Sequence, residues 1–161
     1  MRKVVVFGNS GSGKSTLAKK LCQTEGLSHL DLDLIAWLPT TPVQRKPINE
    51  SKLDINEFTS THSNWVIEGC YSDLLELVLP EATEIIFLNL PVEACIANAK
   101  QRSWEPHKYE SKAVQDRNLA MLIDWIAQYP IRKDVFSKLS HETLFANFKG
   151  KKAQYTCNEH L

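Results

Sequence analysis

The sequence feature that most constrains the fold is a glycine-rich stretch near the start of the chain. Residues 8–15 read Gly-Asn-Ser-Gly-Ser-Gly-Lys-Ser and match the pattern G-x-x-x-x-G-K-[ST] at every fixed position. The segment before it, residues 2–7, is rich in valine and ends on phenylalanine, which predicts a short buried strand. Over residues 14–25 apolar residues recur at helical spacing, and Gly26 follows as a helix-ending residue would. A strand, a tight loop and a helix in this order predict the first unit of a parallel α/β sheet.

Strand-like and helix-like segments continue to alternate along the chain. Further strands are expected over residues 28–32, 65–68, 84–90 and 142–148. Helices are expected over residues 55–63, 92–102, 112–129 and 132–139, and the tail from Lys149 is expected to be polar and loose. The 161 residues are expected to form a single domain. This alternation predicts an α/β fold of three layers, in which a five-stranded parallel sheet carries helices on both faces.

The composition limits the classes of partner and compartment. Nineteen basic and 19 acidic residues give a formal net charge of zero, which disfavours nucleic acid and an anionic membrane as partners. The four cysteines are scattered without a C-x-x-C pair, so buried free thiols in a cytoplasmic protein are expected rather than disulfides or a zinc site. The histidines without metal-ligand spacing, which we expect to be exposed or hydrogen-bonded, are His29, His62, His141 and His160.

The chemistry of the glycine-rich loop points to a nucleoside triphosphate. Glycines let backbone N–H groups approach phosphate oxygens closely, and the helix that follows presents its positive end to the same anion. Lys14 is expected to reach the β- and γ-phosphates, and the Ser15 hydroxyl to ligate Mg²⁺. A glycine-rich turn with a chance lysine is the alternative, and the strand–loop–helix context argues against it. The residues predicted to contact the nucleotide are Gly8, Asn9, Ser10, Gly11, Ser12, Gly13, Lys14, Ser15 and Thr16.

Three acidic residues follow or end two predicted strands, and the carboxyl ends of parallel strands meet at the ligand edge of such a sheet. Asp31 and Asp33 stand two residues apart, so in an extended chain their carboxylates point the same way and can share a metal and a hydroxyl. Glu68 ends the next strand and is predicted to hold a metal-bound water or to orient an acceptor. The alternative for each is an ordinary polar residue before a turn.

A polar segment over about residues 102–117 carries large rings and, with its flanks, several cations: Lys100, Arg102, His107, Lys108, Lys112 and Arg117. Cations on a closing loop can stabilise the charge that spreads over a phosphoryl group in transfer. Arg102 and Arg117 are the preferred candidates, because a guanidinium binds phosphate through two hydrogen bonds. Two interpretations of the aromatic residues 104–109 remain open, a substrate-covering lid and a helix terminator that packs on the core.

With these residues in view, the chain resembles small P-loop kinases of the adenylate kinase and shikimate kinase type. That resemblance implies the strand order 2-3-1-4-5, an acceptor-binding region over about residues 33–63 and an arginine-bearing lid after strand four. It also implies that Asp31 contacts Mg²⁺ through water and that Asp33 contacts the acceptor hydroxyl. Three features resemble bacterial proteins described as adenylate kinase-like or as DNA topology modulation (FlaR-like) proteins. They are His29-Leu30-Asp31 with Trp37, Trp65-Val66-Ile67-Glu68-Gly69 with Tyr71, and the aromatic lid.

The predicted function is therefore phosphoryl transfer from ATP, with Mg²⁺, to a small-molecule acceptor. The proposed catalytic residues are Lys14, Asp33, Glu68, Arg102 and Arg117. The turn after the third strand reads Cys70-Tyr71, which matches neither the shikimate nor the AMP pattern, so the sequence does not identify the acceptor. Acceptor-free ATP hydrolysis, a nucleotide-regulated switch acting on a macromolecule, and a binding module without catalysis are the alternatives.

Overall fold

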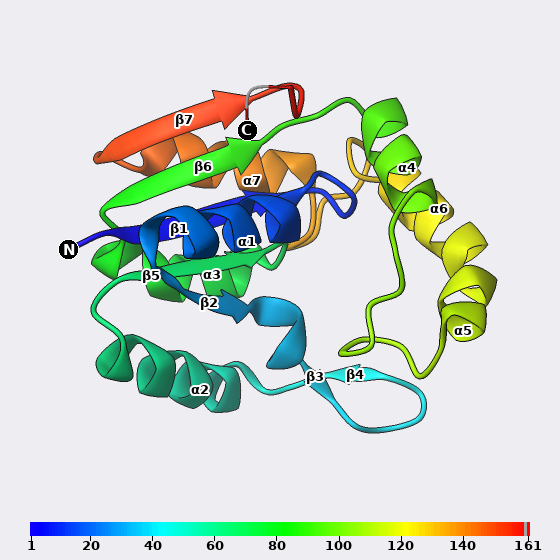
Figure 1. Cartoon of the computed structure of the whole chain (residues 1–161), viewed down its shortest axis with the longest axis horizontal. Coiled ribbons are helices and arrows are strands. Elements are labelled where there is room, and N and C mark those ends of the chain that lie inside the picture. Colours follow the sequence, from blue (N-terminus) through cyan, green and yellow to red (C-terminus); the bar gives the residue numbers. More distant parts are fainter. Residues whose placement is uncertain (160) are drawn as a thin grey trace.

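A computed structural model describes residues 1–159 and 161 of the chain. Its centre is a parallel sheet of five strands in the order β2-β5-β1-β6-β7 (Figure 1). These strands are β1 (Lys3–Gly8), β2 (Ser28–Asp31), β5 (Trp65–Gly69), β6 (Glu84–Leu88) and β7 (Lys151–Tyr155). Counted along the sheet strands alone, this is the predicted order 2-3-1-4-5, and the predicted fold class is confirmed.

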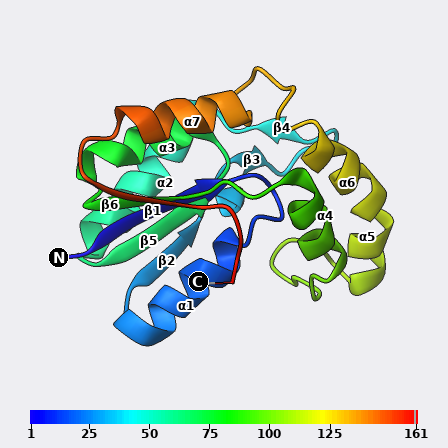
Figure 2. The ribbon, with the colours of Figure 1, turned by 90° about the horizontal axis from the view of Figure 1, so that it is seen from above.

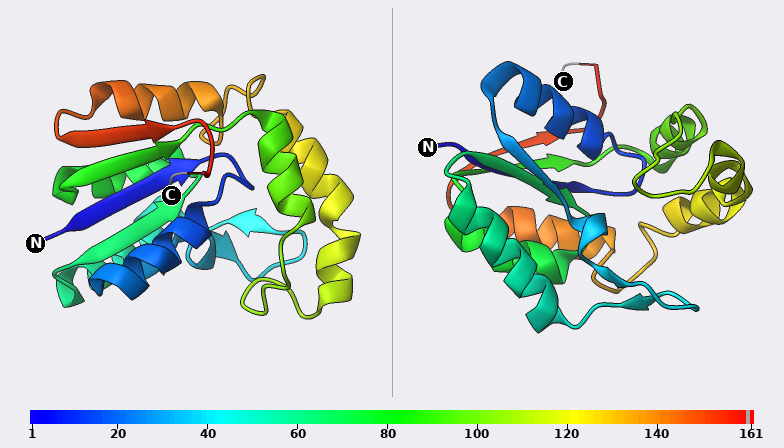
Figure 3. Two further views of the ribbon diagram at one scale, coloured as in Figure 1. Left: turned by 45° about the horizontal axis from the view of Figure 1, so that its top comes forward. Right: turned by 60° about the horizontal axis from the view of Figure 1, so that its bottom comes forward.

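Helices cover both faces of the sheet, as Figures 2 and 3 show. The helices are α1 (Lys14–Glu25), α2 (Ile48–Thr61), α3 (Ser72–Val78), α4 (Val92–Lys100), α5 (Lys112–Arg117), α6 (Leu119–Ala127) and α7 (Lys138–Asn147). Helix α1 lies on one face, and α2, α3 and α7 lie on the other. Helices α4, α5 and α6 stand at the end of the sheet where the strands finish.

The alternation of side chains along β1 divides the apolar interior into two cores. Val5 and Phe7 face one core, together with apolar residues of α2, α3 and α7. Val4 and Val6 face the other, together with residues of α1, α4 and α6. All four side chains are fully buried, which is why the strand reads as a continuous apolar run. The glycine-rich loop leaves the end of this strand, which is the central one of the sheet and is therefore paired on both sides.

The region predicted to bind an acceptor, about residues 33–63, contains a short antiparallel hairpin of β3 (Trp37–Leu38) and β4 (Gln44–Arg45). Arg45 ties this hairpin to α3, because its Nη2 donates to both Asp73 oxygens at 3.1 and 3.2 Å. The guanidinium also lies 5.0 Å from the centre of the Tyr71 ring. Arg45 therefore anchors the hairpin to the core.

Several predicted element boundaries are wrong, for identifiable reasons. The helix expected at 55–63 is α2, which begins seven positions earlier at Ile48, because Pro47 is tolerated at a helix start rather than marking a loop. The helix expected over 112–129 is divided into α5 and α6 at Asn118, whose side-chain amide donates to the Val114 carbonyl oxygen at 2.8 Å. Helix α3 was not predicted.

The C-terminal predictions are wrong in element type. Residues 142–148, expected as a strand, lie mostly in α7, and the helix expected over 132–139 starts only at Lys138. Leu144, Phe145 and Phe148 have helical spacing, which the strand prediction overlooked. The fifth strand is β7, in the tail expected to be loose. It pairs with β6 alone, and its lysines are typical of an edge strand rather than a buried one.

None of the described helices combines the length and the apolar character that crossing a bilayer requires. The four cysteines are free, but only Cys95 is fully buried and Cys157 is exposed, whereas buried thiols were predicted.

Candidate active site

The glycine-rich loop is shaped for close approach of a ligand to its backbone. Gly11 and Gly13 have φ angles of 78° and 94°, in the left-handed region that glycine alone adopts without strain. A Cβ on Gly11 would collide with the Cys95 carbonyl oxygen, so α4 presses against the outer side of the loop. Helix α1 begins directly after Gly13 and directs its N-terminal N–H groups to the same place.

Lys14 lies across the loop that it follows. Its Nζ donates to the Asn9 carbonyl oxygen at 2.7 Å, and its side chain lines the cavity next to the loop. The Asn9 side chain is buried and donates to the Ile126 carbonyl oxygen at 3.2 Å, which holds the loop against α6. The Lys14 ammonium is therefore positioned where the loop would hold phosphate oxygens.

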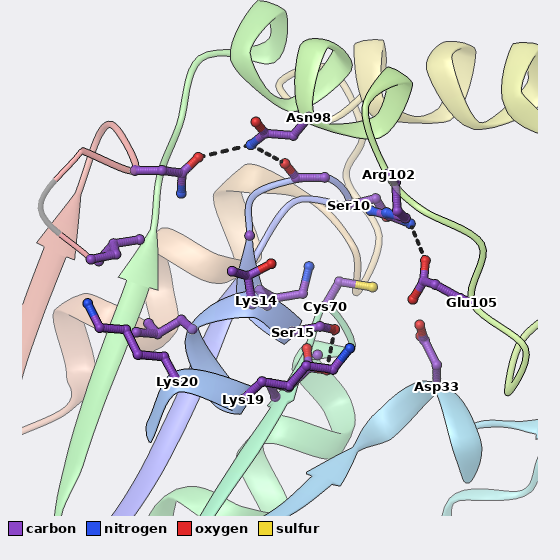
Figure 4. A pocket seen from close by; sticks show the side chains of 18 of the residues that line it. Ser10, Lys14, Ser15, Lys19, Lys20, Asp33, Cys70, Asn98, Arg102 and Glu105 are labelled. Carbon is purple, nitrogen blue, oxygen red and sulfur yellow. Dashed lines mark hydrogen bonds and ion pairs between the residues drawn. The ribbon is translucent and has the colours of Figure 1, made fainter. Parts of the chain in front are cut away.

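Two asparagine side chains fasten the outer side of the loop. Asn98 Nδ2 donates to the Gly11 carbonyl oxygen at 2.8 Å and to Asn158 Oδ1 at 2.9 Å (Figure 4). Asn158 Nδ2 in turn donates to the Ser12 carbonyl oxygen at 3.0 Å. The contribution of the C-terminal segment was not foreseen, because Asn158 is 146 residues from the carbonyl that it contacts.

Ser15 and Glu68 meet at the carboxyl end of the sheet. Ser15 Oγ donates to Glu68 Oε1 at 2.9 Å, and the Glu68 residue is only 2% exposed. His29 Nε2 lies 3.4 Å from the same carboxylate oxygen. A hydroxyl and a carboxylate in contact are oxygen donors of the kind that Mg²⁺ uses.

The two aspartates at the end of β2 and just after it have different surroundings. Asp31 is 6% exposed and pairs along the sheet with Glu68, whereas Asp33 lines the cavity. Burial raises the pKa of the Asp31 carboxyl, and the neighbouring charges of Glu68 and Asp33 raise it further. Burial alone would raise the pKa of Asp33, but the ammonium of Lys108 and the hydrogen bonds that Asp33 accepts lower it below its ordinary value.

Lys108, in the segment predicted to form a lid, contacts both aspartates. Its Nζ lies 2.7 Å from Asp33 Oδ2, 3.3 Å from Asp31 Oδ2 and 3.5 Å from Glu105 Oε2. Burial alone would lower the pKa of Lys108, but the carboxylates of Asp33 and Asp31 outweigh it and raise that pKa. The sequence prediction included Lys108 among the lid cations but preferred the arginines.

The two arginines preferred from the sequence lie in different places. Arg102 lines the cavity, where its Nη1 lies 3.2 Å from Glu105 Oε1 (Figure 4). Arg117 is exposed on α5 and is not one of the described residues that line the cavity. The structure therefore brings Lys14, Ser15, Asp33, Glu68 and Arg102 to one cavity, and leaves Asp31 just behind it and Arg117 outside it.

Two residues beneath the cavity, Cys70 and His141, are not activated for reaction. Burial raises the pKa of the Cys70 thiol to about 12, so this cavity-lining cysteine is not activated. His141 is fully buried, accepts from the Tyr129 hydroxyl through Nδ1 at 2.7 Å and donates from Nε2 to the Cys70 carbonyl oxygen at 2.8 Å. The expectation that His141 is satisfied by hydrogen bonds is confirmed. His160 lies outside the described residues.

The donors present fit a nucleotide with magnesium better than a metal alone. The cavity has a volume of about 500 Å³, within the range of small-molecule sites. Among the described residues, no three His, Cys, Asp or Glu side chains are grouped to hold a metal ion. Ser15 and Glu68 would therefore supply only part of a coordination shell, and Mg²⁺ commonly completes such a shell with phosphate oxygens and water.

Comparison with solved structures finds proteins with the same fold. A sugar kinase from Janibacter sp. HTCC2649 superposes with a TM-score of 0.56 at 14% identity, covering 97% of this chain and 85% of that one. A shikimate kinase from Bacteroides thetaiotaomicron superposes with a TM-score of 0.54 at 17% identity, covering 97% and 86%. The sequence matches no family model and no curated protein.

At such identities the likeness shows the fold, which is that of shikimate kinase-like P-loop proteins. It agrees with the resemblance to shikimate kinases inferred from the sequence. It does not support the narrower assignment to the FlaR-like proteins.

Proposed function

We propose that this protein transfers the γ-phosphate of ATP, with Mg²⁺, to the hydroxyl of a small-molecule acceptor. The observation that carries the proposal is one cavity of about 500 Å³ shared by both halves of such a reaction. Lys14 and Ser15 line its loop side, while Asp33 and Lys108 line its lid side. A donor and an acceptor bound there would lie next to each other, as transfer between them requires.

The loop side binds and neutralises the donor phosphates. The backbone N–H groups of residues 8–16 would hold the phosphate tail, and Lys14 would leave the Asn9 carbonyl oxygen to reach the β- and γ-phosphates. Ser15 and Glu68 would hold Mg²⁺, with Asp31 supplying negative charge from behind Glu68. Bound Mg²⁺ would neutralise charge on the phosphate oxygens.

The lid side handles the acceptor. Asp33 would accept a hydrogen bond from the acceptor hydroxyl and then its proton as the new bond forms. Its lowered pKa keeps the carboxylate ionised and able to accept, although it makes Asp33 a weak base. Arg102 is the arginine we assign to the transferred phosphoryl group, because it lines the cavity. Arg117 could serve only after a movement of α5 that brings it inward.

Acceptor-free hydrolysis of ATP is the second candidate function. It is favoured by the ion pair between Lys108 and Asp33, which occupies the carboxylate oxygen that an acceptor hydroxyl would use. In that case the lid would close on ATP alone, and water would be the acceptor.

A transfer assay with γ-labelled ATP separates these functions. The protein is incubated with Mg²⁺ and one acceptor at a time from three classes: neutral sugars, hydroxy acids and nucleoside monophosphates. Label on an acceptor supports the kinase, and label released only as free phosphate supports the hydrolase. Nucleotide binding by calorimetry without turnover would contradict both.

A further inference from the structure

Three side chains from separate parts of the fold form a hydrogen-bonded chain that ends on Asp33. Trp37, on the hairpin strand β3, donates from Nε1 to the Tyr71 hydroxyl oxygen at 2.8 Å. The Tyr71 hydroxyl, just after β5, donates to Asp33 Oδ1. Neither link joins residues that are close in sequence.

The direction of this chain is determined by the groups in it. An indole N–H can only donate, so the Tyr71 oxygen accepts from Trp37 and its single proton is left for Asp33. Donation into the hydroxyl oxygen also makes its proton a stronger donor. The Asp33 carboxylate is thus held at Oδ1 by a group that cannot offer the proton elsewhere.

Tyr71 itself has little freedom to move. The residue is 3% exposed, and its ring packs edge-on against Trp37 at 6.2 Å and Phe136 at 5.2 Å between centroids. With Oδ1 engaged, the other oxygen of Asp33 is the one that contacts Lys108, a second cavity-lining residue. The geometry therefore separates the two oxygens, one for support and one for the cavity.

We infer that Tyr71 is a positioning residue for phosphoryl transfer, which holds Asp33 so that Oδ2 faces the acceptor hydroxyl. This inference rests on the proposed function. In the step, the acceptor oxygen forms a bond to the γ-phosphorus, and the bond from that phosphorus to the bridging oxygen of the departing nucleoside diphosphate breaks. The acceptor hydroxyl proton passes to Asp33 Oδ2, where the acceptor has taken the place of the Lys108 ammonium.

A double-mutant cycle tests whether Tyr71 acts through Asp33. The variants are Tyr71→Phe, Asp33→Asn and the two combined, assayed for ATP turnover with the acceptor that the transfer assay identifies, or with water if hydrolysis is found. Tyr71→Phe is expected to lower kcat about tenfold, the effect of one hydrogen bond to a charged group, with the KM for ATP unchanged. In the Asp33→Asn background the same change is expected to have no effect.

The matched control is Phe136→Leu, which removes packing from the same ring but no hydrogen bond. Any fall in kcat that Phe136→Leu causes is expected to be equal in the wild type and in Asp33→Asn. Trp37→Phe is a second variant at the other end of the chain, and a smaller fall in kcat is expected that also disappears with Asp33→Asn. It keeps the test available if Tyr71→Phe does not fold.

A readout without ligand accompanies the kinetics. In the free protein, proton NMR is expected to detect a slowly exchanging Tyr71 hydroxyl proton that is lost in Tyr71→Phe and retained in Phe136→Leu. Equal losses of turnover from Tyr71→Phe in both backgrounds, or full activity in that variant, would overturn the inference and leave the proposed function standing. A wild-type protein that turns over no ATP would remove the proposed function, and this inference with it.

Discussion

The two sides of the cavity are built in different ways. The loop side consists of residues 8–16, consecutive in the chain, and works through backbone groups and one lysine. The lid side gathers Asp33, Arg102 and Lys108, with Tyr71 behind Asp33, from three distant segments, and it would work through side chains. A site made of consecutive backbone can be recognised from a sequence pattern, whereas a site made of distant side chains depends on the packing of the whole domain.

The first prediction tests the loop side at Lys14, the lysine that we expect to contact the phosphates. Lys14→Met is expected to lower ATP turnover about a thousandfold, because it removes the charge opposite the transferring phosphate. Turnover is measured by phosphate release, with the melting temperature as a check on folding. Lys149→Met, on an exposed lysine between α7 and β7 that does not line the cavity, is the matched control and should retain full activity. Near-normal turnover in Lys14→Met would contradict the proposed site.

The second prediction concerns His141, which lies beneath the cavity and donates to the Cys70 carbonyl oxygen. Burial lowers the pKa of His141 from 6.5 to about 4, so the folded protein keeps the ring neutral where the unfolded chain protonates it. The stability that this provides is complete above pH 6.5 and is lost as the pH falls from 6.5 toward 4. The loss from this residue is about 3 kcal/mol at most, by the relation of 1.36 kcal/mol per pKa unit.

Urea unfolding at pH 7, 5.5 and 4.5 measures this effect in the wild type and in His141→Gln. The variant is expected to be less stable at pH 7 but to lose less stability on acidification. Identical pH dependence in the two proteins would show that His141 is not responsible.

The third prediction tests the backbone of the loop. Gly11→Ala places a Cβ against the Cys95 carbonyl oxygen at a φ that alanine adopts only with strain. A weakening of nucleotide affinity by tens of times is expected, equivalent to about 2 kcal/mol, measured by calorimetry. Gly26→Ala is the matched control. Gly26 also has a positive φ but nothing close to its Cβ position, so the variant carries the same backbone strain at a position outside the cavity. Equal affinities in the two variants would mean that the loop tolerates the added atom.

The fourth prediction distinguishes the two lid arginines. Arg102→Ala is expected to lower kcat about tenfold while changing ATP affinity little, because its charge acts as the phosphoryl group moves. Arg117→Ala, on the exposed surface of α5, is expected to change kcat less. If Arg117→Ala has the larger effect, the lid must close further than in this structure, and the assignment of roles reverses.

The sequence predicted those strands and helices whose local apolar pattern agrees with their burial in the fold. The strand before Gly8, the helix after Gly13 and the strands ending at Gly69 and Leu88 have apolar patterns that match their burial. The C-terminal strand and helix were assigned incorrectly because β7 is an exposed edge strand with polar residues, while α7 contains large apolar residues that also suit a strand.

By itself, the sequence determined the glycine-rich loop between a strand and a helix, the α/β class and the candidate residues on both sides of the cavity. These depend on short-range pattern and on backbone geometry that few residues other than glycine permit. The tertiary structure alone decided that Glu68 contacts Ser15, that Lys108 reaches Asp33 and that Tyr71 holds Asp33 from behind. Contacts of this kind join residues 38 to 75 positions apart, and their partners are chosen by the order of strands in the sheet and by the packing of side chains at its carboxyl edge.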